Sequence, residues 1–315
     1  MKIFTDISDF KIKNTVVTIG TFDGVHKGHK MVINRLNEIS TTNNFQSVVF
    51  TFEPHPRILL NPDEKDLKLL NTTDEKITLL EEAGIDNIIL FPFTREFSKL
   101  SACEFVKQIL VEKLNIKYLV VGFNHQFGKN REGDYNKLVD CAKEFNFKIE
   151  KLDPLYITDI KISSTKIRKA LNNGEIKLAN SYLGYEYSIT GKVIGGKKTG
   201  RKLGFPTANI KVYDSYKQIP RDGVYVVEVF WKEEKHIGML NIGIRPTIDG
   251  LNQRKSIEVH IINFNKKIYY DDLKIVFKQR LRDEQKFDGV GALKNQLMND
   301  RIETIKIMKE ICSRQ

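Results

Sequence analysis

The chain has 315 residues, of which 41% are hydrophobic and 29% charged, and this composition is typical of a globular protein with one large or two ordinary domains. No apolar run approaches the roughly 18 residues that span a bilayer, the N-terminal stretch is polar, and the three cysteines are scattered, which excludes membrane, exported and disulfide-rich classes and indicates the cytoplasm. The net charge of +11 is consistent with binding of nucleic acid or of small phosphorylated ligands, and equally with lysines that are simply spread through helices. Charge alone does not decide among these three explanations.

From residue 14 to about residue 160 the chain alternates short β-rich runs with helical patterns. Apolar runs such as VVTIG and YLVVG, separated by helices, predict a parallel sheet covered on both faces, that is, a doubly wound α/β domain. Ligands bind at the carboxyl ends of the strands in such sheets, where the loops 20–29, 52–56 and 122–131 emerge. The predicted strands are 15–19, 47–52, 87–91, 118–122 and 147–151, and the predicted helices are 27–40, 73–83, 102–114 and 135–145.

The stretch GTFDGVHKGH lies between the first predicted strand and its helix. A glycine-rich turn that leads into a helix N-terminus gathers free backbone N–H groups and the positive end of the helix dipole, which predicts an anion site. His26 and His29 share a face of the first helical turn, and we expect a phosphate to approach the backbone between the two imidazoles because Gly28 has no β-carbon. The phosphate-binding candidates of this stretch are Gly20, Phe22, Gly24 and Gly28.

A second candidate phosphate site is the segment SSTKIR. Ser163, Ser164 and Thr165 stand at a predicted helix start, where hydroxyls cap the helix and donate to a phosphate. Arg168, one turn later, supplies a planar charged fork for phosphate oxygens. An N-cap with a surface arginine explains this segment when it is taken alone, and the histidine pair favours the phosphate site. Short helices follow to about residue 183, and we place the domain boundary between 1–184 and 185–315.

After residue 185, strand-like segments follow one another without long helices, which predicts an antiparallel β-barrel covered by a final helix at 290–312. The run 191–198 nearly spells the phosphate loop GxxxxGK, but Lys198 stands where Ser or Thr should hold Mg²⁺, so we do not interpret it as one. The predicted strands of this half are 187–193, 223–231, 235–242, 256–262 and 274–280.

The first half resembles the prokaryotic FAD synthetases, a family of HxGH nucleotidyltransferases. GTFDGVHKGH is similar to their GxFDGVHxGH, TFEPHP to TFxPHP, and SSTKIR to SSTxIR. VGFNHQFG is similar to their VG[DE][DN]FxFG, with Phe123 replacing an acidic residue and His125 an aromatic one. The resemblance implies adenylyl transfer from ATP to FMN with release of pyrophosphate. It implies catalytic roles for His26, His29 and Arg168, a nucleotide contact for Asn124 and flavin contacts for His55 and Pro56.

The second half resembles the riboflavin kinases. GRKLGFPTAN is similar to their GRxLGxPTAN, NIGIRPT to NIGxxPT, and LRDEQKF to LRxExKF. Thr207 and Asn209 alternate in an extended segment, so both point to one side and can reach Mg²⁺ and nucleotide phosphates. The resemblance makes Glu258 the general base that takes the proton from a ribityl hydroxyl. It further implies nucleotide contacts for Gly204 and Pro206 and flavin contacts for Arg282, Glu284 and Phe287.

Together these features predict an HxGH nucleotidyltransferase domain with a doubly wound parallel sheet, followed by an antiparallel β-barrel riboflavin kinase domain with a terminal helix. Its partners are riboflavin, FMN and ATP, with Mg²⁺ and without nucleic acid or membrane, in a monomer or weak homo-oligomer. One alternative is a single-activity adenylyl- or cytidylyltransferase with a degenerate second domain, although Thr207, Asn209 and Glu258 are intact. Another is a basic nucleic-acid-binding module, although the chain has no recognisable zinc, RRM or basic-zipper pattern.

Overall fold

The computed structural model describes residues 1–62, 67–123, 128, 133–157, 159–196, 199–245 and 254–313. Contacts along the chain divide it into two compact units, Met1–Ser164 and Thr165–Gln315. The second unit therefore includes most of α6 (Ser164–Asn173) and all of α7 (Ile176–Leu183), which lie before the boundary expected from the sequence. The boundary between residues 184 and 185 stays a prediction.

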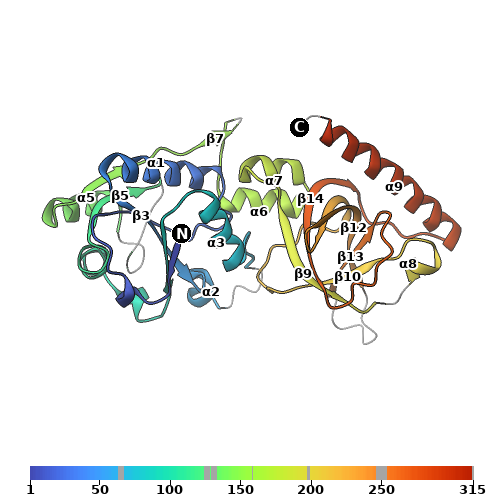
Figure 1. The fold of residues 1–315 in the computed structure, drawn as a ribbon, viewed down its shortest axis with the longest axis horizontal. Coiled ribbons are helices and arrows are strands. Elements are labelled where there is room, and N and C mark those ends of the chain that lie inside the picture. The colour runs from blue at the N-terminus through green and yellow to red at the C-terminus, as the bar shows by residue number, and fades with distance from the viewer. Residues whose placement is uncertain are drawn as a thin grey trace. The chain divides into compact units, whose positions relative to one another are not determined.

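The first unit is built on a parallel sheet of six strands, and its doubly wound architecture is confirmed (Figure 1). Val16 and Val17, neighbours on the central strand, are buried against opposite faces, because successive residues of a strand alternate in direction. Helices α1 (Lys27–Asn43) and α3 (Thr73–Glu82) cover the face of Val16. The face of Val17 is covered by α4 (Ala102–Phe105), the helical segment after it and α5 (Tyr135–Glu144). The strand order is β1 (Lys2–Phe4), β4 (Asn87–Pro92), β3 (Gln46–Glu53), β2 (Thr15–Ile19), β5 (Ile116–Val121) and β6 (Lys148–Lys151).

The helices of this unit largely follow the predicted periodicity. Helix α1 keeps its apolar positions in the core, with Val32, Ile33, Leu36 and Ile39 buried. The predicted helix 102–114 is a short α-helical turn that continues as a π-helix over Val106–Val111. The α-helices are α1 (Lys27–Asn43), α2 (Pro56–Leu60), α3 (Thr73–Glu82), α4 (Ala102–Phe105) and α5 (Tyr135–Glu144), and a hairpin of β7 (Tyr156–Ile157) and β8 (Ile160–Lys161) follows β6.

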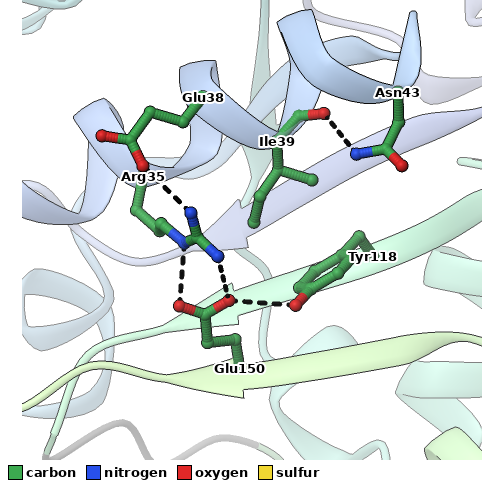
Figure 2. A network of polar contacts seen from close by, with 6 residues as sticks. All are labelled: Arg35, Glu38, Ile39, Asn43, Tyr118 and Glu150. Atoms are coloured by element: carbon green, nitrogen blue, oxygen red, sulfur yellow. Dashed lines mark hydrogen bonds and ion pairs between the residues drawn. The ribbon is translucent and has the colours of Figure 1, made fainter.

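A polar network ties α1 to the strands beneath it (Figure 2). Both oxygens of Glu150, on β6, accept hydrogen bonds from Arg35 of α1, at 2.8 and 3.0 Å. The hydroxyl of Tyr118, on β5, donates to the same carboxylate at 2.9 Å, and Glu38 accepts a further bond from Arg35. These hydrogen bonds lower the pKa of Glu150, the arginine contributing most. The network therefore fixes the position of α1 over the sheet, and α1 carries the histidine pair at its start.

The second unit is a closed antiparallel barrel, also as predicted (Figure 1). Its strands pair in the order β10 (Ala208–Val212), β13 (Arg254–Ile261), β12 (Glu234–Arg245), β11 (Gly223–Trp231), β14 (Asp272–Arg282) and β9 (Ser188–Ile194). The short α8 (Thr199–Lys202) precedes β10, and α9 (Val290–Cys312) covers the outside of β11 and β12. Ile307 and Met308 of α9 pack on Val226. Across the described ranges no helix is both long and apolar enough to cross a membrane.

Candidate functional site

The turn after β2 is held in place by backbone hydrogen bonds. The Asp23 carboxylate accepts from the backbone N–H of Leu70 at 2.7 Å, and the Asp23 carbonyl accepts from the hydroxyl of Ser164 at 2.8 Å. Gly24 has a φ of +91°, a conformation that favours glycine. Ser164, the middle residue of the SST segment, thereby contacts the turn within the first unit. Gly20, at the end of β2, donates to the carbonyl of Phe50.

His26 is the N-cap of α1 rather than a member of its first turn. Its Nδ1 accepts a hydrogen bond from the backbone N–H of His29 at 3.3 Å, so in the neutral ring the proton lies on Nε2. The two imidazoles are stacked, with centroids 3.7 Å apart and planes 13° from parallel. The ring of Phe22 packs on His29 at 5.1 Å between centroids. Rings stacked at this distance leave no space for a phosphate between their faces.

Gly28 also makes room for the imidazole stack. A β-carbon at this position would meet the ring of His26 at 3.2 Å, which is closer than side chains normally pack. The approach of a phosphate to the backbone at Gly28 stays a prediction.

Burial keeps both imidazoles neutral. It lowers the pKa of His26 to about 4. Burial also lowers the pKa of His29 well below its usual value, and the adjacent His26 lowers it further. The Nδ1 atom of His29 is buried without a hydrogen-bond partner in the part of the chain that the structure describes. Neutral imidazoles can offer N–H donors to phosphate oxygens, and a buried unpaired nitrogen gains most from such a ligand.

The other candidates of the first half are placed less completely. His55 is the N-cap of α2, with its Nδ1 accepting from the N–H of Arg57 at 3.2 Å, and Pro56 is the first helical residue. Both follow β3, which pairs with β2, so they share the sheet edge with the histidine turn. Ser163 lies half-buried before α6. Asn124 lies outside the described residues.

Thr165 and Arg168 belong to the second unit, where an arginine Nη2 donates to the threonine hydroxyl at 3.5 Å. The arginine is half-buried one turn into α6, and the threonine is exposed. The binding of phosphate oxygens by Arg168 stays a prediction.

The barrel brings the kinase candidates together. Thr207 donates from its hydroxyl to a carboxylate oxygen of Glu258 at 3.1 Å. Asn209 on β10 and Asn241 on β12 are both paired in register with Glu258, which lies between them on β13. Asn241 was not among the predicted site residues, and its amide donates to Glu284 at 3.1 Å. The pairing of β12 with β13 places Asn241 beside Glu258, and the sequence pattern alone does not reveal that pairing.

Neighbouring residues fix the backbone around Thr207 and leave room for the side chain of Asn209. His260, two residues after the candidate base, contacts the carbonyl of Pro206 through Nδ1 at 2.8 Å, and burial lowers its pKa. Gly204 has a φ of +84°. A β-carbon on Gly196 would lie 2.1 Å from the Asn209 amide nitrogen, so the glycine leaves room for that side chain. Hydroxyl, amide and carboxylate oxygens converge here, and such hard oxygen donors fit Mg²⁺.

Among the flavin candidates of the barrel, Arg282 contacts α9. It forms three hydrogen bonds with the buried carboxylate of Asp300 on α9, at 2.9, 3.2 and 2.7 Å, and its guanidinium lies 5.9 Å from the ring centre of Phe287. The guanidinium charge is therefore already paired. Glu284 lines an open depression of about 420 Å³ beside Arg221 and Lys255.

Comparisons with known proteins agree with this arrangement. Residues 9–166 match the FAD synthetase family, and residues 183–308 match the riboflavin kinase family. A bifunctional riboflavin kinase/FMN adenylyltransferase of Buchnera aphidicola subsp. Schizaphis graminum is 40% identical over 311 residues, covering 97% of this chain and 98% of that protein. The protein of that name from Escherichia coli K12 is 36% identical and covers 94% of each. A crystal structure from Streptococcus pneumoniae, named there as a macrolide-efflux protein, has 32% identity and a TM-score of 0.88, covering 96% of this chain and 97% of that one.

Proposed function

The chain belongs to the family of bifunctional riboflavin kinase/FMN adenylyltransferases, and we propose that the Glu258 cluster and the His26–His29 turn carry its two reactions. The enzyme phosphorylates riboflavin to FMN and adenylates FMN to FAD, with ATP as the second substrate of both steps. The assignment of each step to named side chains rests on the geometry of the two clusters.

In the kinase step, Glu258 accepts the proton of the ribityl 5′-hydroxyl while that oxygen attacks the γ-phosphorus of ATP and ADP leaves. The hydrogen bond from Thr207 orients the carboxylate of Glu258. Thr207 and Asn209 would hold Mg²⁺, which when bound neutralises charge on the transferred phosphate. His260 and Gly204 set the backbone that presents them.

In the transferase step, a phosphate oxygen of FMN attacks the α-phosphorus of ATP, and the bond to the β-phosphate oxygen breaks to release pyrophosphate. No covalent bond to the protein is needed, so the side chains have to position the phosphates and stabilise charge. His26 and His29 donate N–H groups as neutral imidazoles, beside the N-terminus of α1. The resemblance further gives Arg168 the role of a permanent positive charge for phosphate oxygens.

The observation that carries the kinase assignment is the 3.1 Å contact between Thr207 and Glu258, which joins two motifs 51 residues apart. The observation that carries the transferase assignment is the stacking of the two imidazoles at the start of α1. A cytoplasmic location, a monomeric or weakly self-associating state, the absence of nucleic acid as a partner and the need for Mg²⁺ belong to the same proposal.

The test is a chromatographic product assay on the whole enzyme with two variants. Glu258→Gln should give no FMN from riboflavin and ATP, yet convert added FMN to FAD. His29→Asn should give FMN and no FAD. Glu233→Gln, an exposed glutamate of the β11–β12 turn, is the matched control and should leave both rates unchanged. FMN formation by Glu258→Gln at the wild-type rate would contradict the assignment of the base. FMN as the sole product of wild type would contradict the assignment of adenylyl transfer to the first unit.

A further inference from the structure

Lys76 is a buried lysine that neither reaction, as assigned above, uses. It lies on α3, and only 7% of it is exposed, which is rare for a lysine. Its Nζ donates to the hydroxyl of Thr51 at 3.3 Å and to the carbonyl of Phe52 at 3.4 Å. Burial lowers the pKa of Lys76, whereas the carboxylates of Glu53 and Asp23 raise it. A buried ammonium held by two long bonds is costly, so its retention calls for a use beyond packing.

The ammonium is linked through Thr51 to the turn that precedes the histidines. The hydroxyl of Thr51, which accepts from Lys76, itself donates to the carbonyl of Thr21 at 3.3 Å. Thr21 is part of the turn that leads from β2 to His26. Asp23, whose charge acts on Lys76, holds Leu70 with its carboxylate and Ser164 with its carbonyl. One chain of contacts thus joins Lys76 to the backbone that presents the imidazoles.

We propose that Lys76 is a positioning residue for adenylyl transfer, which holds the end of β3 against the turn and places a fixed positive charge behind the phosphates. The inference rests on the proposed function of the histidine turn. Lys76 acts through Thr51 and through its field, not by contact with the substrate. Because little water separates the buried charge from the turn, it is screened less than a surface lysine would be.

The effect should be larger in the transition state than in the ground state. Negative charge builds on the departing pyrophosphate as the α–β bond breaks, and a preorganised cation stabilises that charge without moving. A residue that merely supported the fold would instead weaken substrate binding and turnover together. The proposal therefore predicts a fall in kcat for FAD formation with little change in the KM for ATP.

The experiment compares two variants. Lys76→Met keeps an unbranched side chain of similar length and removes the charge, whereas Lys76→Arg keeps the charge. Lys76→Met should lower kcat for FAD formation by about tenfold or more with the KM for ATP changed by less than about threefold, and Lys76→Arg should recover most of the rate. FMN formation by the barrel serves as the internal measure of an intact enzyme and should not change. Lys107→Met, an exposed lysine of the same unit, is the matched control.

Wild-type kcat in Lys76→Met would overturn the proposal, and so would a parallel loss in Lys76→Met and Lys76→Arg with a raised KM. His29→Asn is measured in the same series. If His29→Asn makes FAD normally, the proposed function of the turn fails; if it does not, and Lys76→Met is normal, only the role of Lys76 fails.

Discussion

His26 should titrate near pH 4 instead of near its usual 6.5, because burial of its ring penalises the imidazolium form. That lowering corresponds to roughly 3 kcal/mol, at about 1.4 kcal/mol for each pH unit. The unfolded chain takes up the proton first, so folding loses this free energy as the pH falls from about 6.5 to about 4 and keeps it above 6.5. A charged ring in the stack would also face the neighbouring imidazole of His29 at 3.7 Å between centroids.

The measurement is an NMR titration of the histidine ring carbons in the full-length protein, with His26→Gln used to assign the resonance. A midpoint within about one pH unit of 4 is the expected result. The same variant should lose less stability on acidification than wild type, by up to roughly 3 kcal/mol between pH 7 and pH 4. A midpoint for His26 near 6.5 would refute the reasoning, because the ring would then be hydrated and the transferase site would not hold neutral donors.

Three further changes test separate parts of the structure. Gly28→Ala should lower the rate of FAD formation by roughly tenfold and leave FMN formation unchanged, because the added β-carbon displaces the ring of His26; equal rates in a product assay would contradict this. Thr207→Val should raise the Mg²⁺ concentration that half-saturates the kinase by roughly tenfold without affecting conversion of FMN to FAD, and an unchanged Mg²⁺ titration would remove the residue from the proposed metal site. Glu150→Gln should lower the unfolding free energy of the first unit by roughly 1 kcal/mol, which is measured as faster amide exchange in α1. Glu38→Gln removes only the exposed ion pair with Arg35 and should change that free energy by less than about 0.5 kcal/mol. Equal effects of the two variants would show that the contact between Arg35 and Glu150 does not stabilise α1.

The sequence predicted those parts of the fold that repeat a period. The alternation of apolar strands and helices gave the parallel sheet, and dense turn signals gave the barrel. Strand β1 was missed because three residues at a sheet edge carry no period, and β10 because it follows directly on the loop that holds the kinase motif. The π-helical segment Val106–Val111 has the apolar spacing of an α-helix, so its different hydrogen bonding leaves no trace in the pattern.

The sequence motifs predicted which residues belong to the candidate sites, but they did not predict the contacts between the side chains of those residues. The contact of Gly28 with the His26 ring was not predicted, because ring stacking between His26 and His29 depends on side-chain torsions, which spacing does not encode. Asn241 belongs to the motif NIGIRPT but was given no role, because its place beside Glu258 comes from the pairing of β12 with β13. Long-range contacts, such as the hydrogen bond between Arg282 and Asp300, are likewise set by tertiary packing.

The central claim is that one chain performs two chemically different transfers from ATP in sequence. The most direct test is the incubation of wild-type enzyme with riboflavin and ATP that is radiolabelled either at the γ- or at the α-phosphate. The account predicts that the γ label enters FMN and is retained in FAD, whereas the α label enters FAD alone. Label from the α-phosphate in FMN, or FAD without label from the γ-phosphate, would contradict it.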